Sequence, residues 1–299
     1  MFSLTVMMYH YVRDPGDAAQ ANSGIPGLPT AQFNTQLDTL ARDYEMISWD
    51  DLRAALLQQK NLPERACLLT FDDGVCDHYL NVFPALHARN LSGIFFALAH
   101  ASQDELALGH KLHYLLACLG VDGLRRAIWK NLNPSQREQF VTAEARYRQR
   151  WHSELDVFKG VLQRDLADEI NPLLSQLLAQ HVAPESELAH HHYLDDAQIQ
   201  EMRAGGMHFG GHSRTHPWFD CIDAPRRADE IRASQHWLES VEDAPFAFAY
   251  PYGGLADDAP ALLSNSNFLA AFTTREATTH VNPFYIGRFD GEELQNPKG

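Results

Sequence analysis

Short apolar runs alternate along much of the chain with segments in which apolar residues recur every three or four positions. The short runs predict strands at residues 4–9, 67–71, 93–98, 207–211, 246–250, 269–273 and 284–288, with a shorter one near 45–48. Helical spacing occurs at Phe33, Leu37 and Leu40, at Leu52, Leu56 and Leu57, and from a capping residue, Asp195, onward. Strands that alternate with helices predict an α/β barrel of parallel strands, which suits a chain of 299 residues with 45% hydrophobic content.

Residues 101–194 interrupt this alternation and predict a helical insertion between two parts of the barrel, 1–100 and 195–299. An apolar stripe spans about six helical turns, and it consists of Leu155, Phe158, Leu162, Leu166, Ile170, Leu173 and Leu177. The insertion is either a packing element that adds stability or a lid or specificity element beside the site, and the pattern favours neither. A dimerisation surface is a third interpretation, and the sequence does not define the oligomeric state.

The charge balance narrows the range of partners. With a net charge of −15 and a pI of about 5.4, the chain is not expected to bind nucleic acid, whereas carbohydrate stays open. No apolar stretch approaches the ~20 residues that cross a bilayer, and residues 1–8 lack the positive segment of a signal peptide. The four cysteines show no close-paired spacing. These features predict a cytoplasmic protein without a transmembrane segment.

Residues 67–74, Cys-Leu-Leu-Thr-Phe-Asp-Asp-Gly, join a strand-like run to two adjacent acids and a glycine. Adjacent side chains on a strand point to opposite faces, so Asp72 and Asp73 share a pocket only if the chain turns there, as Gly74 permits. Such a pair suggests one carboxylate for a metal and one for proton transfer. A solvated turn that closes the strand is the alternative that this run leaves open.

His212 and His216 lie four residues apart in the glycine-rich segment 206–217. On one helical turn this spacing places both imidazoles on the same face, where they can hold one ion. The 16 histidines of the chain make chance pairs common, so the spacing alone is weak evidence. Together with an aspartate, the pair would give three protein ligands and leave positions open for water, as a catalytic divalent site requires.

A third segment, residues 246–254 (Phe-Ala-Phe-Ala-Tyr-Pro-Tyr-Gly-Gly), is an apolar strand broken by a proline. Its rings can line a groove, and a buried strand with an ordinary turn is the alternative. The candidates that directly follow strand-like runs are His10, Asp72 and Asp73, His212, and Tyr250 to Tyr252. Because active sites of parallel barrels lie at the carboxyl ends of the strands, these positions predict one shared site.

In this order, Thr70-Phe-Asp-Asp-Gly74, His212-Ser-Arg-Thr-His216 and Tyr250-Pro-Tyr-Gly253 resemble the motifs of the polysaccharide deacetylases, the NodB-homology domain of carbohydrate esterase family 4. The opening Met7-Met-Tyr-His-Tyr-Val12 looks like the start of the branch that deacetylates exported poly-N-acetylglucosamine. The resemblance covers about residues 1–100 and 195–290. It implies a distorted (β/α)7-8 barrel of parallel strands, into which the helices of 101–194 are inserted.

The resemblance implies a role for each matching residue. Asp72 would be the general base that activates water, and Asp73, His212 and His216 would bind the metal. In the branch with the N-terminal Tyr-His motif that histidine is the general acid, which would be His10 here. A backbone N–H near Tyr252 would help to bind the developing oxyanion. Zinc suits two imidazoles and a carboxylate, with iron, cobalt, nickel or manganese as alternatives.

The chain departs from the family pattern in two places. An arginine that orients the catalytic aspartate is usual at the position of Phe248, and we expect Arg288 to take over by reaching Asp72 from a neighbouring strand. The commoner family members keep their acid in a Leu-x-His segment near the C-terminus, where this chain has only the loop-like His280. This gap favours His10 as the acid.

The predictions extend to other polar and aromatic residues. Substrate contacts are expected from Tyr250, Tyr252, Arg214 and Trp218. His190 to His192 are interpreted as a solvated loop, and His208 is expected to point away from the site. His110 and His113 are interpreted as an exposed helix end, although they could approach substrate.

These residues are suited to amide hydrolysis, because a metal, a carboxylate base and a histidine acid supply the required nucleophile and protons. The prediction is a metal-dependent hydrolase that removes an N-acetyl or other N-acyl group from an amino sugar of a surface polysaccharide or its precursor. One alternative is a metal-dependent amidase acting on a small non-sugar amide. Another is a catalytically inactive carbohydrate-binding protein on the same scaffold.

Overall fold

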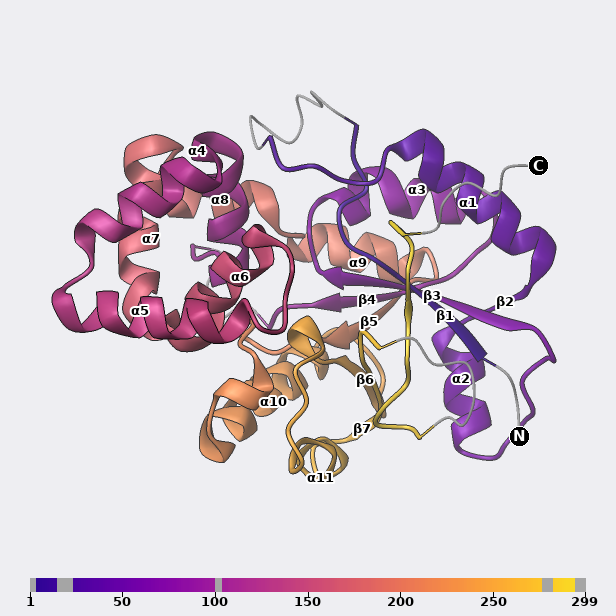
Figure 1. Cartoon of the computed structure of the whole chain (residues 1–299). Helices are drawn as coiled ribbons and strands as arrows, with labels where there is room; N and C mark the ends of the chain where they lie inside the picture. The colour runs from indigo at the N-terminus through magenta and orange to yellow at the C-terminus, as the bar shows by residue number, and fades with distance from the viewer. Residues whose placement is uncertain (1–3, 15–23, 100–103, 276–281, 294–299) are drawn as a thin grey trace.

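The computed structural model describes residues 4–14, 24–99, 104–275 and 282–293. A curled sheet of parallel strands forms the centre, helices pack around it, and a separate lobe of helices lies beside it (Figure 1). The predicted α/β fold, a distorted (β/α)7-8 barrel with a helical insertion, is thereby confirmed. Within the described ranges, no helix is both long and apolar enough to cross a membrane.

The strands described in the sheet pair in parallel, in the order β7-β6-β5-β4-β3-β1-β8, with β2 paired to the first residues of β3. They are β1 (Leu4–Tyr9), β2 (Glu45–Ile47), β3 (Ala66–Asp73), β4 (Ile94–Ala97), β5 (His208–Gly211), β6 (Phe246–Ala249), β7 (Phe268–Phe272) and β8 (Phe289–Asp290). All but the last overlap a run predicted from the sequence. The predicted strand at 284–288 is wrong. That segment forms an isolated bridge to β7, between Ile286 and Phe272, and then leads to β8, which pairs with β1.

Alternation along the strands separates two apolar layers. The layer that includes Phe71, Phe95 and Phe248 packs beneath the outer helices. On the opposite face, Phe96 of β4 and Phe272 of β7 touch with ring centroids 5.3 Å apart, although two strands lie between them. Contact across that span requires a concave face, so this second layer is the inside of the barrel.

The outer layer is covered by helices whose apolar faces point to the sheet. These helices are α1 (Thr30–Asp43), α3 (Phe83–His87), α9 (Asp196–Ala204), α10 (Ala224–Leu238) and α11 (Ala259–Ser264), while α2 (Trp49–Leu56) packs on the inner layer. Asp195 caps α9 as predicted, with its carboxylate accepting from the backbone of Gln198. Leu57 lies just beyond α2 and is exposed, contrary to the predicted helical face.

The insertion forms a helical lobe with its own hydrophobic core. Its helices are α4 (Leu108–Asn131), α5 (Pro134–Tyr147), α6 (Glu154–Gly160), α7 (Ala167–His181) and α8 (Glu185–His192). The predicted stripe does not form one helix, because the backbone leaves helical geometry at Leu166. The solvated loop predicted for His190 to His192 is also wrong, since these residues end α8 and His192 is buried.

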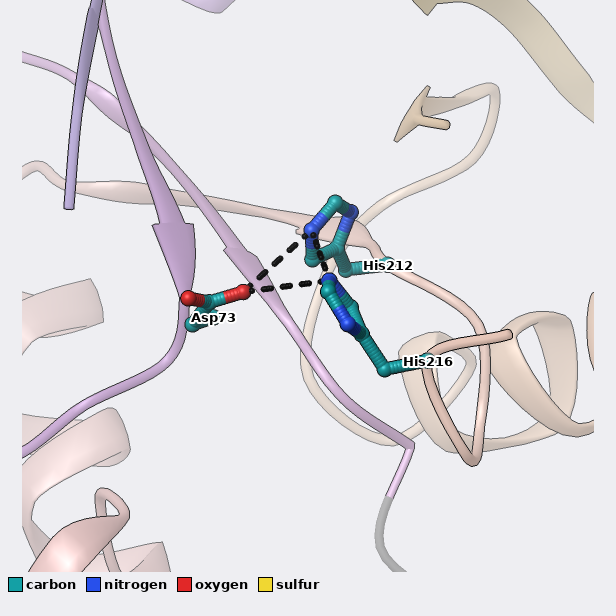
Figure 2. Close-up of side chains that lie close together, drawn as sticks. All are labelled: Asp73, His212 and His216. Atoms are coloured by element: carbon teal, nitrogen blue, oxygen red, sulfur yellow. Dashed lines mark hydrogen bonds and ion pairs between the residues drawn. The ribbon is translucent and has the colours of Figure 1, made fainter. Parts of the chain in front are cut away.

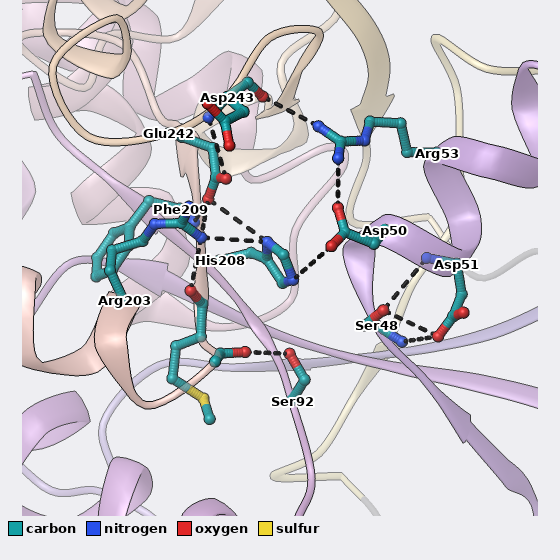
Figure 3. Close-up of polar contacts among 12 residues, drawn as sticks. Ser48, Asp50, Asp51, Arg53, Ser92, Arg203, His208, Phe209, Glu242 and Asp243 are labelled. Carbon is teal, nitrogen blue, oxygen red and sulfur yellow. Dashed lines mark hydrogen bonds and ion pairs between the residues drawn. The ribbon is translucent and has the colours of Figure 1, made fainter.

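A polar cluster lies at the amino end of β5, away from the carboxyl edge of the sheet (Figure 3). The buried carboxylate of Glu242 accepts a hydrogen bond from the backbone N–H of Phe209 at 2.9 Å and pairs with Arg203 at 2.8 Å. His208 lies 3.5 Å from the same carboxylate and 3.9 Å from Asp50. His208 thus points away from the candidate site, as expected.

Candidate active site and metal centre

The carboxyl ends of the parallel strands bring the predicted site residues to one edge of the sheet. His10 directly follows β1, Asp72 and Asp73 end β3, and His212 directly follows β5. Arg288 reaches the same region from the segment between β7 and β8. The late histidine His280 lies outside the described residues.

The chain turns at the second acid of the pair. Asp73 has a φ of 79° and Gly74 a φ of 64°, in the left-handed region that glycine adopts readily and aspartate seldom does. A Cβ on Gly74 would lie 2.7 Å from the Cβ of Ala97, so only glycine fits there. The predicted turn is present and starts one residue early, which lets both carboxylates reach the same edge of the sheet.

His212 and His216 are brought together by an irregular loop, so the predicted helical turn is wrong. Ser213 and His216 have φ values of 65° and 58°. The loop is fixed by Glu230 of α10, whose carboxylate accepts hydrogen bonds from the N–H groups of Arg214 and Thr215 at 2.7 and 2.8 Å. Uncommon backbone geometry held in place by a buried side chain is typical of functional sites.

Asp73, His212 and His216 converge on one buried point (Figure 2). Oδ1 of Asp73 lies 3.4 Å from Nε2 of His212 and 3.3 Å from Nε2 of His216, and the two nitrogens are 3.1 Å apart. This buried oxygen makes no hydrogen bond to any residue that the structure describes. Nδ1 of His212 lies 2.7 Å from the carbonyl oxygen of Ala249, which fixes Nδ1 as the donor and leaves Nε2 a lone pair. One carboxylate oxygen and two imidazole nitrogens fit a divalent transition metal.

The other acid, Asp72, forms a bidentate ion pair with Arg288. Nη1 donates to Oδ1 at 2.6 Å and Nη2 donates to Oδ2 at 2.7 Å, while Nε of the same guanidinium donates to the carbonyl of Thr273. Both side chains are almost fully buried. The contact that we expected between Arg288 and Asp72 is therefore present, and Phe248 lies on the outer face of β6, where an arginine would not point to Asp72.

The charges around the two acids keep both ionised. Burial opposes ionisation of Asp72, but the charge and hydrogen bonds of Arg288, together with the nearby His212 and His10, outweigh it and hold the pKa of Asp72 below its usual range. Burial also opposes ionisation of Asp73, where contacts with His110, His212 and His216 hold the pKa well below the usual value. Burial lowers the pKa of His216 to about 4, so this ring is neutral and able to bind a metal at neutral pH.

His10 lies beside Asp72, with Nε2 3.9 Å from Oδ2, and its side chain is 33% exposed. Its backbone is anchored because Nε2 of the buried His78 lies 3.0 Å from the His10 carbonyl oxygen. The pKa of His78 is lowered to about 4 by burial, so the anchoring ring is neutral and can donate the bond. A partly exposed imidazole next to the candidate base is well placed to exchange protons with a bound substrate.

A cavity of about 420 Å³ opens beside His216, between the barrel and the helical lobe. Three of the predicted substrate residues, Arg214, Trp218 and Tyr252, line it. The rings of Trp218 and Tyr252 stack with centroids 4.8 Å apart. Tyr250 does not lie where a substrate contact was predicted, because its side chain is fully buried in the outer layer beneath the helices.

The helical lobe contacts this site directly, although the sequence left open whether the insertion is a packing element or part of the site. His110 is 1% exposed, not an exposed helix end, and its Nε2 lies 3.1 Å from Oδ2 of Asp73. Gln163 of the lobe donates to the hydroxyl of Tyr252 at 3.3 Å. Neither Gln163 nor Glu230 was among the residues predicted from the sequence. Sequence spacing gave no signal for the contacts of His110, Gln163 and Glu230, since each contact joins residues at least 15 positions apart.

Comparison with known proteins finds similarity to polysaccharide deacetylases. Residues 168–270 match the family model described as Polysaccharide deacetylase. This segment includes β5, His212, His216 and β6. YxkH of Bacillus subtilis strain 168, itself a candidate polysaccharide deacetylase, is 25% identical over 111 residues, which are 37% of this chain and 35% of that protein. The match thus spans about a third of the relative's length.

Solved structures share the fold over nearly the whole chain. The deacetylase PplD of Streptococcus pyogenes, in complex with acetate, superposes with a TM-score of 0.57 at 16% identity, covering 96% of this chain and 92% of that one. IcaB of Ammonifex degensii gives a TM-score of 0.58 at 18% identity, with coverages of 99% and 93%. A de-N-acetylase of Aggregatibacter actinomycetemcomitans gives 0.58 at 15% identity, with coverages of 96% and 94%. Together with the family match, these similarities confirm the resemblance to the polysaccharide deacetylases.

Proposed function

We propose that this protein is a metal-dependent N-deacetylase that hydrolyses the N-acyl group of an amino sugar in a surface polysaccharide or its precursor. One observation carries the proposal. A buried oxygen of Asp73 without a hydrogen-bond partner among the described residues faces the Nε2 atoms of His212 and His216, and the adjacent Asp72 is held ionised by Arg288. Zinc is the proposed metal, because imidazole and carboxylate ligands suit it.

The remaining chemistry is assigned to residues of the chain. A bound divalent ion would polarise the acyl carbonyl and lower the pKa of a bound water toward about 7. Asp72 would accept the proton of that water, and Arg288 keeps Asp72 ionised for this role. His10, at the partly exposed side of Asp72, would give a proton to the leaving amine. A backbone N–H near Tyr252 would stabilise the developing oxyanion.

The cavity supports a sugar as the substrate. Trp218 and Tyr252 both line it, and aromatic rings provide apolar faces for the faces of sugar rings. Arg214 also lines the cavity and would attract an anionic substituent. The cytoplasmic location expected from the sequence stays a prediction.

A substrate panel tests the proposal against its alternatives. Purified protein loaded with Zn²⁺ is incubated with N-acetylglucosamine oligomers, with poly-N-acetylglucosamine, and with small cyclic imides and formamides, and released acid and free amine are measured. We expect equal amounts of acetate and free amine from the amino sugars. Hydrolysis of only the small amides would support the amidase alternative, and glycan binding without turnover would support the inactive carbohydrate-binding protein.

A further inference from the structure

The helical lobe meets the candidate metal centre at both ends of its chain segment. Where the chain leaves the lobe, the N–H of Leu194 donates to the carbonyl of Gly74 at 2.9 Å and the N–H of Cys76 donates to the carbonyl of His192 at 2.8 Å. These bonds fasten the lobe to the turn that directly follows Asp73. Where the chain enters the lobe, the first turn of α4 carries His110 to the same aspartate.

His110 contacts the carboxylate oxygen of Asp73 that does not face the two ligand histidines. Its Nε2 lies 3.1 Å from Oδ2, whereas Oδ1 faces His212 and His216. The ring of His110 also lies face to face with that of His216, with centroids 5.9 Å apart and an interplanar angle of 23°. Oδ1 of Asp73 therefore faces the proposed metal position, and Oδ2 contacts the lobe through His110.

The ionised carboxylate of Asp73 only accepts hydrogen bonds, so Nε2 of His110 carries a proton, and Tyr193, at the other end of the lobe, meets Nδ1 of the same ring. The backbone N–H of Ala107 donates to the Tyr193 hydroxyl oxygen at 2.9 Å, and that oxygen lies 2.7 Å from Nδ1 of His110. With the hydroxyl proton donated to Nδ1, the imidazole proton lies on Nε2 and is directed at Oδ2 of Asp73. The hydrogen bonds then run in one direction, from Ala107 through Tyr193 and His110 to Asp73.

We propose that His110, delivered by the helical insertion and oriented by Tyr193, is a positioning residue of the metal centre that fixes the carboxylate of Asp73 for metal binding. This inference rests on the proposed metal-dependent function. A hydrogen bond to the oxygen that does not bind the metal holds the carboxylate plane, so that the other oxygen stays directed at the ion. Partners of this kind typically change metal affinity by about 10–100-fold. The insertion is then part of the active site as well as a wall of the cavity.

The test measures Zn²⁺ affinity of the full chain by competition with a chromophoric chelator, without any substrate. We expect His110→Ala to bind Zn²⁺ roughly 10–100-fold more weakly than the wild type. His110→Gln, whose amide nitrogen can replace Nε2 as donor, should restore most of the affinity. His113→Ala is the matched control, because it removes a histidine one turn further along α4 that has no hydrogen bond or ion pair to Asp73 among the described contacts, and its affinity should stay near that of the wild type.

Several outcomes would overturn the inference. These are unchanged Zn²⁺ affinity in a folded His110→Ala, or a His110→Gln that is as weak as His110→Ala. Co²⁺ absorption provides a further check, since a changed coordination number in His110→Ala would make His110 a ligand itself. If His110→Ala fails to fold, Tyr193→Phe replaces it, because it removes only the hydroxyl and should still weaken binding, whereas unchanged affinity would contradict the inference.

The same titration separates this inference from the proposed function. If the wild type binds no metal, the proposed function fails. If the wild type binds one ion, His212→Ala abolishes binding and His110→Ala has no effect, only the positioning role fails.

Discussion

The guanidinium of Arg288 donates hydrogen bonds to both carboxylate oxygens of Asp72, at 2.6 and 2.7 Å, although the two residues lie 216 positions apart in the sequence. The pair is buried inside the barrel, with the guanidinium 5.6 Å from the centre of the Phe96 ring. In a buried environment, a bidentate ion pair of this kind fixes both the charge and the orientation of the carboxylate. Arg288 can therefore replace the arginine that is missing at Phe248.

Replacing Arg288 by alanine should lower turnover and move the acid limb of the pH–rate profile to higher pH. Arg288 holds the pKa of Asp72 below its usual range, so its loss raises that pKa, and the base becomes protonated at a higher pH. The measurement is kcat/KM between about pH 4 and 8, because its acid limb reports the free enzyme's essential base. Unchanged turnover and an unchanged acid limb would contradict a role for Arg288.

Arg203→Ala is the matched control for this variant. Arg203 also pairs with a buried carboxylate, that of Glu242, but at the opposite end of the strands (Figure 3). Its loss should lower stability, since the buried carboxylate of Glu242 loses its arginine partner. The pH–rate profile should keep its shape.

Asp72→Asn should reduce the rate by about 10²–10⁴-fold, the usual effect of removing a proton-transfer group. Metal content should stay near that of the wild type, because Oδ1 of Asp73 and the two histidines are unchanged. The paired measurements are acetate release and metal per chain. Full activity in Asp72→Asn would exclude Asp72 as the base, and absent turnover in the wild type as well would favour the inactive carbohydrate-binding alternative.

His10→Ala should impair the hydrolysis of amides much more than that of an activated aryl ester. An amine leaving group needs a proton, whereas a phenolate of low basicity leaves without one, so only amide hydrolysis depends on a general acid. The measurement is the ratio of the two rates in wild type and variant. His208→Ala serves as the control, since His208 lies at the other end of β5. An equal loss on both substrates would argue against His10 as the acid.

Glu230→Ala should weaken metal binding and lower the free energy of unfolding by about 1–3 kcal/mol, because two backbone N–H groups lose their acceptor. These N–H groups belong to the loop between His212 and His216, so the spacing of the two ligands is no longer fixed. Zn²⁺ affinity and denaturant unfolding are measured on the same samples. Asp229→Ala, an exposed neighbour on α10, should change neither. Normal Zn²⁺ affinity in Glu230→Ala would show that the loop holds its shape without this side chain.

Much of the barrel could be predicted from sequence because short-range signals specify it. Apolar runs located most strands, and Asp195 marked the start of α9 through a local capping contact. The motif residues Asp72, Asp73 and His212 could be placed because they end or directly follow parallel strands, whose carboxyl ends lie at one edge of the sheet. Such signals are contained within a few residues, so no knowledge of distant partners is needed.

The features that sequence failed to predict depend on long-range packing. A spacing of four residues suggested a helical turn for His212 and His216, but the loop geometry is imposed by Glu230 from another helix. His110 resembled an exposed helix end, because its burial arises only when the lobe docks onto the turn after Asp73. Tyr250 follows a strand as the other candidates do, yet its side chain turns into the outer core.

Asp73, His212 and His216 are proposed to bind a catalytic metal, and the metal content of the purified protein, determined by mass spectrometry, tests this proposal without any substrate. Wild type and His212→Ala are purified, incubated with Zn²⁺ and desalted, and circular dichroism checks the fold of both. We expect about one ion per chain in the wild type and a loss of that ion in a folded His212→Ala. No bound metal in the wild type, or an equal amount in both proteins, would contradict it.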